Sequence, residues 1–326
     1  MGYMDYEDFK TELMYELGLR SGEEYTFKLN KANLRNQSEV DAILVVYNDD
    51  AGICPQLYVK DFYERYVEYG TDVVDIAYDL LALADKHKAE VDAVKLAMST
   101  VNAENAKERL IMHVQNRDWN KAMLDDIVYM DLGADLIGVA KYELPELDAF
   151  ITVTKGMQGH LCLTEDEIIE MAYQNSINQE FKVQGLFDVV KDLFEDGIGM
   201  TEEQNPMFIM SNKSGHFGAN VLMSKKMLKE MEELFHEKYF VLPSSIHEVI
   251  AIPESRIDDV QFLKEMVVDV NSTQVDVRER LSDNVYRVSN GRIAISNTQE
   301  QLETLRKEEM ASLQKEINKS ARRRSA

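Results

Sequence analysis

The greatest density of potentially reactive side chains lies in residues 243–248, which contain Ser244, Ser245, His247 and Glu248. A serine nucleophile requires a histidine base within hydrogen-bond reach, an acid that orients the base, and an oxyanion hole. If this segment is an extended strand, Ser245 and His247 share one face and Glu248 points to the other. The glycines of a nucleophile elbow and the second histidine of a zinc-protease motif are both absent. We therefore expect these residues to satisfy backbone groups at a tight connection, and we keep a hydrolase-like pocket as the alternative.

A second group with possible chemistry is the loop 213–216, where Lys213 and His216 could bind a small anion. The loop is not a phosphate-binding P-loop, because it lacks the glycine spacing and the Gly-Lys-Ser ending of that motif. A hairpin turn that needs Gly215 at positive φ explains the loop without a ligand. The ligand-binding interpretation requires that the loop and Ser245 meet in one pocket.

Metal and cofactor sites have little support in the sequence. His160 and Cys162 could lie on one strand face, but two ligands do not make a tetrahedral site and no matching pair occurs elsewhere. The other cysteine, Cys54, is far away in the chain, so neither a disulfide framework nor a zinc site is indicated. We predict no metal and no cofactor.

The charge of the chain restricts its partners. The 326 residues include 36 basic and 59 acidic side chains, which gives a net charge of −23. Such a field repels nucleic-acid backbones and anionic lipid, so we expect no direct nucleic-acid binding and no membrane binding. A protein partner is compatible with this charge. A mimic of DNA would require the carboxylates to line one face as a track, whereas an even scatter would serve solubility alone.

The N-terminal segment carries acidic residues and has no apolar stretch of the kind found in signal peptides. No run approaches the length of uncharged apolar residues that spans a bilayer. We therefore expect a cytoplasmic protein.

Hydrophobic periodicity predicts a mixture of helices and strands along the first third of the chain. Helices are expected over residues 5–17, from residue 61 to about 69, over 71–84 and over 88–107. Gly18 is placed like the stop of the first helix. Strands are expected over Tyr25–Leu29, Ala42–Tyr47 and Ile53–Val59, with turn residues at Asn48–Gly52, and over Arg109–Val114.

A strand-turn-strand-helix order recurs four times, at residues 42–69 and in three units that begin at residues 150, 207 and 285. The hairpins in the last three units are Phe150–Leu163, Met207–Met223 and Val285–Ile295, and the last has the turn Asn290-Gly291. The expected helix caps are Thr164 with Glu167, Ser224, and Asn297 with Glu300. The order indicates either a duplication or a common way to build such a protein, and in both cases the fold class is α+β, with antiparallel β-hairpins followed by helices that pack on the sheets.

We divide the chain into an N-terminal α+β region at residues 1–115, a C-terminal α+β region at 116–296, and a terminal helix with a basic tail at 297–326. The tail has four basic residues from Lys319 to Arg324 and no acid after Glu316. A frayed end is expected there, with a cationic docking segment as the second interpretation.

Several segments of the chain carry a resemblance to a known family: Pro55–Val59 with Phe62 and Tyr63, Arg109 and Leu110 with Asn116 and Asn120, Asn205–Gly218 with Ala219, Val241–Val249, Asn271–Val275 and Leu281–Tyr286. From Ala42 to Asn290 the chain resembles the bacterial family known as domain of unknown function 5688. Lys31–Asn36 replaces an Asn-Asn-Gly turn that is usual in the family. The resemblance implies a bacterial, cytosolic protein, spread in part by mobile elements, with no assigned activity that could be carried over to individual residues.

Two functions from different classes follow. The first is a non-enzymatic accessory or protein-interaction module that uses its acidic surface or a methionine-lined groove. The second is a ligand-binding protein or hydrolase-like enzyme with a pocket at Ser244, Ser245 and His247 and the 213–216 loop. We favour the first, because the second lacks a complete set of catalytic groups.

Overall fold

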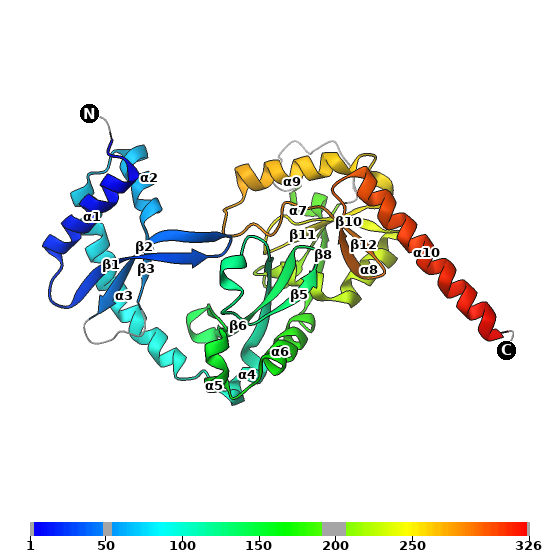
Figure 1. The fold of residues 1–326 in the computed structure, drawn as a ribbon, viewed down its shortest axis with the longest axis horizontal. Coiled ribbons are helices and arrows are strands. Elements are labelled where there is room, and N and C mark those ends of the chain that lie inside the picture. The colour runs from blue at the N-terminus through cyan, green and yellow to red at the C-terminus, as the bar shows by residue number, and fades with distance from the viewer. Residues whose placement is uncertain (1–2, 48–53, 191–206, 325–326) are drawn as a thin grey trace. The chain divides into compact units, whose positions relative to one another are not determined.

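The computed structural model describes residues 3–47, 54–190 and 207–324 (Figure 1). The turn predicted at Asn48–Gly52 and the first residue of the predicted strand Ile53–Val59 lie outside these ranges. The described elements are α1(Tyr6–Arg20), β1(Tyr25–Leu34), β2(Gln37–Tyr47), β3(Gln56–Tyr58), α2(Val59–Tyr69), α3(Val73–Met98), α4(Ala103–Arg109), β4(Leu110–Asn116), η1(Lys121–Met123), β5(Tyr129–Gly133), β6(Leu136–Leu144), η2(Pro145–Leu147), β7(Ala149–Thr152), η3(Lys155–Met157), α5(Gln158–Leu161), α6(Glu165–Ile177), β8(Phe181–Gly185), α7(Leu186–Val190), β9(Phe208–Asn212), η5(Gly218–Met223), α8(Lys225–Phe235), β10(Tyr239–Leu242), β11(Val249–Pro253), η6(Glu254–Arg256), α9(Val260–Gln274), β12(Tyr286–Ser289), β13(Arg292–Ile295) and α10(Gln299–Arg324).

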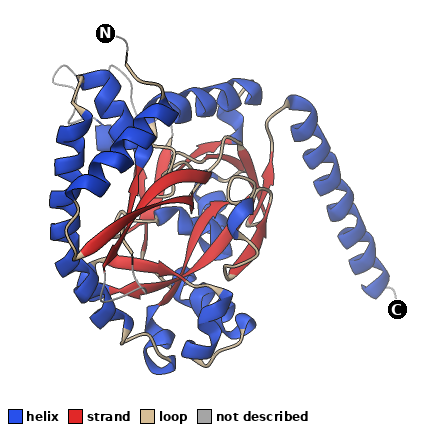
Figure 2. Cartoon of the chain, turned by 60° about the vertical axis from the view of Figure 1, so that its left-hand side comes forward, coloured by secondary structure: helices blue, strands red, loops and turns tan. Residues whose placement is uncertain are grey.

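The α+β class is confirmed: antiparallel sheets carry packed helices (Figure 2). Across the described ranges the strands form a three-stranded sheet in the order β1-β2-β3 and a six-stranded sheet in the order β13-β12-β10-β11-β9-β8. A further sheet has the order β4-β6-β5, with β7 paired to β6. Both edges of the six-stranded sheet therefore come from late or middle parts of the sequence.

Two compact units can be distinguished. The first comprises residues 1–109, 142–151 and 156–163, and the second comprises residues 110–141, 152–155 and 164–326. The boundaries predicted near residues 115 and 296 remain a prediction.

The core of the first unit is built on the expected face of α1, where Phe9, Leu13 and Leu17 are fully buried. The helix does not stop at Gly18 but continues to Arg20, since a single glycine costs a helix only about 1 kcal/mol. The helices expected at 71–84 and 88–107 are largely one continuous helix, α3, because none of the three residues between them is glycine or proline, the two types that cost a helix most.

The six-stranded sheet of the second unit is covered on both faces. On one face, the Tyr239 hydroxyl donates a hydrogen bond to the Leu228 carbonyl of α8. On the other face, Phe240 and Leu242 pack with α9 residues and with Leu302 of α10. Because side chains alternate along β10, α8 lies against one face and α9 and the start of α10 lie against the other.

Two of the predicted hairpins are wrong in their second strand. Residues after β7 form the short helices η3 and α5 instead of a strand at His160–Leu163, and the chain turns at Cys162 with φ of 52°. Residues after β9 form the helix η5 instead of a strand at Phe217–Met223, because Phe217 at φ of 55° turns the chain out of the extended region.

The last hairpin and the helix caps are closer to expectation. Asn290 and Gly291 both have positive φ, as a two-residue turn between β12 and β13 requires. Thr164 and Glu167 form the predicted capping box, and Ser224 caps α8 through the Met227 N–H. The last helix starts at Gln299, and its cap is formed by Thr298 with Gln301 and not, as predicted, by Asn297 with Glu300.

Candidate functional site

The segment Pro243–Glu248 is a connection between β10 and β11, so the strand alternation predicted for His247 and Glu248 does not apply. The Ser245 hydroxyl accepts a hydrogen bond from the His247 backbone N–H at 3.0 Å, and the Ser245 N–H donates to the Glu248 carbonyl at 3.1 Å. These bonds close the turn by the local mechanism typical of serine. The serine oxygen is thus engaged by the backbone.

The 213–216 loop does reach this connection, at its C-terminal end. The Phe217 N–H donates to Nδ1 of His247 at 3.2 Å, and the rings of His216 and His247 lie 5.8 Å apart between centroids. On its other side, Nε2 of His247 faces the Glu279 carboxylate at 3.7 Å. Because Nδ1 accepts from a backbone N–H, that nitrogen is not available as a base for Ser245.

The remaining predicted site residues lie elsewhere. Lys213 forms an ion pair with Glu180 at 2.7 Å, and both side chains are exposed. Ser244 lines a small, mainly apolar cavity of about 70 Å³ between the connection and α9. The structure thus brings His216 and His247 together but places Lys213 and Ser244 in different surroundings. Their roles in ligand binding or catalysis remain predictions.

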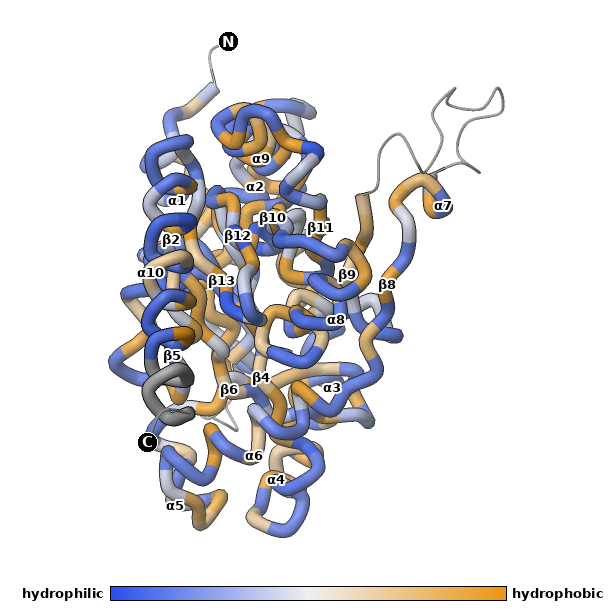
Figure 3. Tube along the Cα trace, turned by 90° about the vertical axis from the view of Figure 1, so that its right-hand side faces the viewer, coloured by the Kyte–Doolittle hydropathy of each residue, from blue (hydrophilic) through white to orange (hydrophobic). Residues whose placement is uncertain are grey.

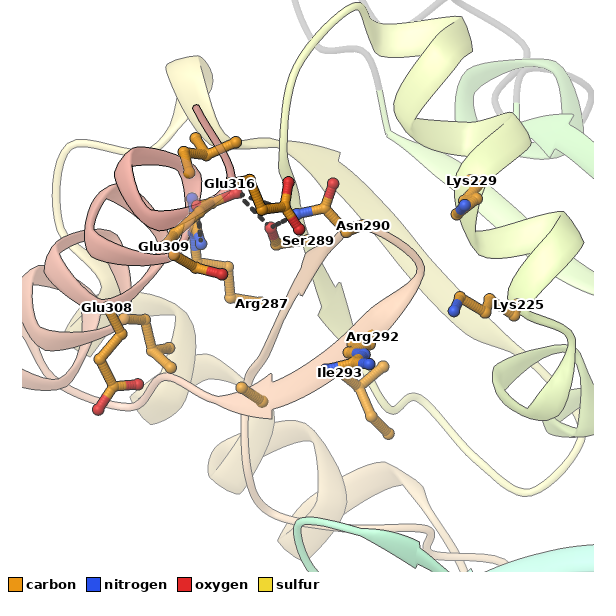
Figure 4. Close-up of a pocket in the computed structure, with 14 residues that line it drawn as sticks. Lys225, Lys229, Arg287, Ser289, Asn290, Arg292, Ile293, Glu308, Glu309 and Glu316 are labelled. Atoms are coloured by element: carbon orange, nitrogen blue, oxygen red, sulfur yellow. Dashed lines mark hydrogen bonds and ion pairs between the residues drawn. The ribbon is translucent and has the colours of Figure 1, made fainter. Parts of the chain in front are cut away.

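A larger concave surface lies at the other end of the same sheet, beside β13 (Figure 4). We call it the α8–α10 groove. Its volume is about 440 Å³, and the helices α8 and α10 and the β12–β13 hairpin supply its walls. The lining residues are Lys225, Lys229, Arg287, Ser289, Asn290, Arg292, Ile293, Ala294, Leu305, Glu308, Glu309, Ser312, Leu313 and Glu316.

The charges of this groove are separated between its walls. Lys225, Lys229 and Arg292 are exposed, and among the described residues none of the three takes part in an ion pair. Figure 4 shows Lys225 and Lys229 pointing from α8 toward the hairpin, with glutamates on α10 at the opposite wall. In a chain with 59 acidic residues, three neighbouring cations without carboxylate partners are unexpected.

The α10 wall is fixed by a partly buried ionic network. Arg287, only 6% exposed in its side chain, donates to Glu254 at 2.7 Å and to Glu309 at 3.1 Å. Burial raises the pKa of Glu309, but hydrogen bonds from Ser289 and Arg287 outweigh it and hold that pKa below its usual value. The Lys238 ammonium adds to the network through Glu309 and Glu232.

The glycine of the hairpin turn is required by space as well as by its φ of 66°. A Cβ at Gly291 would lie 2.8 Å from Cγ of Lys225 and 2.9 Å from the Lys225 carbonyl oxygen. The turn therefore lies directly against α8, and this contact positions the cationic wall relative to β13. The turn is evident from the sequence but the groove is not, because Lys225 and Lys229 lie far from the turn in the sequence.

A polar cluster around Asp135 was also missed. This carboxylate is 4% exposed and accepts hydrogen bonds from Asn116, Ser282, Asn284 and Tyr286, at 2.7–2.9 Å. Burial and the neighbouring carboxylate raise the pKa of Tyr286 well above its ordinary value. All four donors belong to the segments on which the family resemblance rests. Asp135 therefore joins two of those segments, at Asn116 and at residues 282–286, in the folded chain.

Within the described ranges, no cluster of three or more His, Cys, Asp or Glu side chains is placed to hold a metal ion. No described helix has both the length and the apolar character needed to cross a membrane.

Residues 6–289 of the chain match a family of unknown function, DUF5688. No curated protein and no solved structure matches the chain.

Proposed function

We propose that this chain, which belongs to the DUF5688 family, is a protein-interaction module that binds its partner in the α8–α10 groove. The proposal includes a non-enzymatic role in the bacterial cytoplasm. The observation that carries it is a set of three cations that line a preformed groove, Lys225 and Lys229 on α8 and Arg292 on β13, and that have no ion pair among the described residues. A partner that brings carboxylates would satisfy these cations and exclude water from the groove.

The exposed face of α10 supports the same proposal. Leu302 is buried against the sheet, but Met310, Leu313 and Ile317 further along the helix are 72%, 52% and 58% exposed. These three recur at a spacing of three and four residues, which places them on one side of the helix. Figure 3 shows apolar positions recurring along the otherwise hydrophilic α10. An apolar stripe beside a charged groove is typical of an interaction surface.

The alternative, a ligand pocket at Ser244, Ser245 and His247, is less well supported. Both Nδ1 of His247 and Oγ of Ser245 already accept backbone hydrogen bonds. The 213–216 loop contributes its His216 to the neighbourhood but directs Lys213 to Glu180.

Site-specific photocrosslinking tests the proposal. A photoreactive amino acid replaces Ser312, which lines the groove, or its neighbour Ala311, which is equally exposed on α10 but does not line it. In cells that naturally produce the chain, we expect a crosslinked protein product from position 312 and little from 311. Equal products at both positions contradict the proposal. So does a metabolite that raises the melting temperature of the wild type but not of folded His247→Ala.

A further inference from the structure

We propose that the α8–α10 groove takes an extended, acidic peptide segment of a partner protein, which adds to the sheet as a new strand beside β13. This inference rests on the proposed function and specifies the conformation and the chemistry of the bound segment.

Strand β13 is an open edge of the sheet. It ends the six-stranded sheet, and its register with β12 pairs Ser289 with Arg292 and Arg287 with Ala294 across a two-residue turn. In such a hairpin these pairs exchange the backbone hydrogen bonds, so the N–H and C=O groups of Ile293 and Ile295 point away from β12. In the part of the chain that the structure describes, neither residue has another backbone partner. An extended segment would supply one.

The two faces of the sheet beside this edge differ in chemistry. Val288 and Ile293 lie on the α8 face of the sheet, where Lys225 and Lys229 line the groove. Arg287 and Ala294 lie on the α10 face, where Leu305 and Leu313 line it. Side chains of an added strand alternate between these faces. The structure therefore favours a segment in which acidic residues facing the lysines alternate with apolar residues facing the leucines.

A nucleic acid could also satisfy the cations of the groove, but a peptide fits the groove better. A nucleic acid has no main-chain groups to pair with Ile293 and Ile295, and the glutamates of the α10 wall would repel its phosphates. The net charge of −23 adds to that repulsion. A short edge strand with a charged residue can also serve only to prevent pairing with other chains. The experiment must therefore distinguish an edge that binds a strand from an edge that excludes one.

The experiment measures binding of a short, blocked, fluorescent peptide that alternates glutamate and valine, by anisotropy on the full chain. We expect saturable binding that weakens with added salt. A peptide that alternates lysine and valine, and one with the same glutamates and valines arranged in two blocks, should bind at least about tenfold more weakly, since each loses charge or face complementarity.

Substitutions in the chain and N-methylation of the peptide identify the binding site. Lys229→Glu should weaken binding about tenfold, whereas Lys226→Glu should change it less than about twofold, because Lys226 is an exposed lysine on the same helix that does not line the groove. N-methylation of only the glutamates or only the valines gives a second test. In an added strand one set of N–H groups faces β13 and the other faces away, so one peptide should lose binding and the other should keep it.

Three results would overturn the inference: equal effects of the two lysine substitutions, equal effects of the two methylation patterns, or no binding by any of these peptides. Self-association of the chain that Lys229→Glu abolishes would assign the edge to a second copy and would overturn it as well. If crosslinking from position 312 still yields a protein partner, the proposed function stands and only the extended acidic segment is wrong.

Discussion

The backbone N–H of Phe217 donates a hydrogen bond to Nδ1 of His247, and the two rings lie 5.4 Å apart between centroids. The bond joins the loop after β9 to the connection between β10 and β11, which are separated by 30 residues in the sequence. The Ser211 hydroxyl adds a second link, since it donates to the His247 carbonyl at 2.8 Å. His247 therefore holds two loops together and supplies an acceptor for the partly buried N–H of Phe217.

His247→Ala should lower the free energy of unfolding by about 1–3 kcal/mol, because the Phe217 N–H loses its acceptor and the ring contacts are removed. Urea denaturation of the purified chain measures the change. His216→Ala is the matched control, since that imidazole is exposed and should be nearly neutral. An unchanged stability in His247→Ala would return this histidine to the list of functional candidates.

Gly218→Ala should be more severe. A Cβ at this position would lie 2.1 Å from Oγ of Ser211, 2.4 Å from the His247 carbonyl oxygen and 2.6 Å from the Asn212 nitrogen. Two of these three atoms belong to the backbone, so the loops must separate, at a cost of about 3 kcal/mol. The measurement is again urea denaturation, with Gly159→Ala as the control, because no atom lies within 4 Å of a Cβ there. Restoration of stability by an added Ser211→Ala would show that only the side chain was in the way.

Local patterns in the sequence were sufficient for part of the fold. The turn Asn290-Gly291 and the capping box of Thr164 and Glu167 were predicted from a few adjacent residues. The helix η5 was predicted as a strand, because the contact that excludes a Cβ at Gly218 comes from Ser211 and from His247, and no local pattern reveals it.

The candidate site, too, could be predicted only in part from local sequence. The predicted cluster at 243–248 was reactive by composition, but hydrogen bonds to the backbone engage Ser245 and His247. The α8–α10 groove could not be predicted, because its lysines lie on α8 and its Arg292 lies on β13. These two elements are roughly 60 residues apart in the sequence. Whether a cation has a carboxylate partner is a property of the folded chain and not of its composition.

Acid should release the wall of the groove that α10 forms. The pKa of Glu309 in the folded state lies below its ordinary value of 4.5 despite burial, owing to Ser289 and Arg287. A depressed carboxyl pKa contributes stability above the unfolded pKa, and the contribution is lost as the pH falls through the folded value. We therefore expect Glu309→Gln to destabilise the protein by about 2 kcal/mol at pH 7, and the difference from wild type to shrink as the pH falls below 4.5 through the folded pKa.

Hydrogen exchange of residues 299–309 at each pH reports this release, and faster exchange in Glu309→Gln at pH 7 is the expected result. Glu308→Gln is the control, because the Glu308 carboxylate is exposed and has no ion pair among the described residues. A difference between Glu309→Gln and wild type that persists undiminished at low pH would contradict the assignment.

The Asp135 cluster gives the last prediction, in which alkaline pH isolates the contribution of Tyr286 to stability. Asp135→Ala should cost roughly 4 kcal/mol, since several buried donors lose one shared acceptor. Tyr286→Phe removes a single hydrogen bond and should cost only about 1 kcal/mol at pH 7. Because the pKa of Tyr286 is raised in the folded state, its contribution is complete below about pH 10 and is lost as the pH rises above that value. Denaturation from pH 7 to 11 should therefore show the wild type losing its advantage over Tyr286→Phe above pH 10, and a constant difference across that range would mean that Tyr286 ionises as easily when folded as when unfolded.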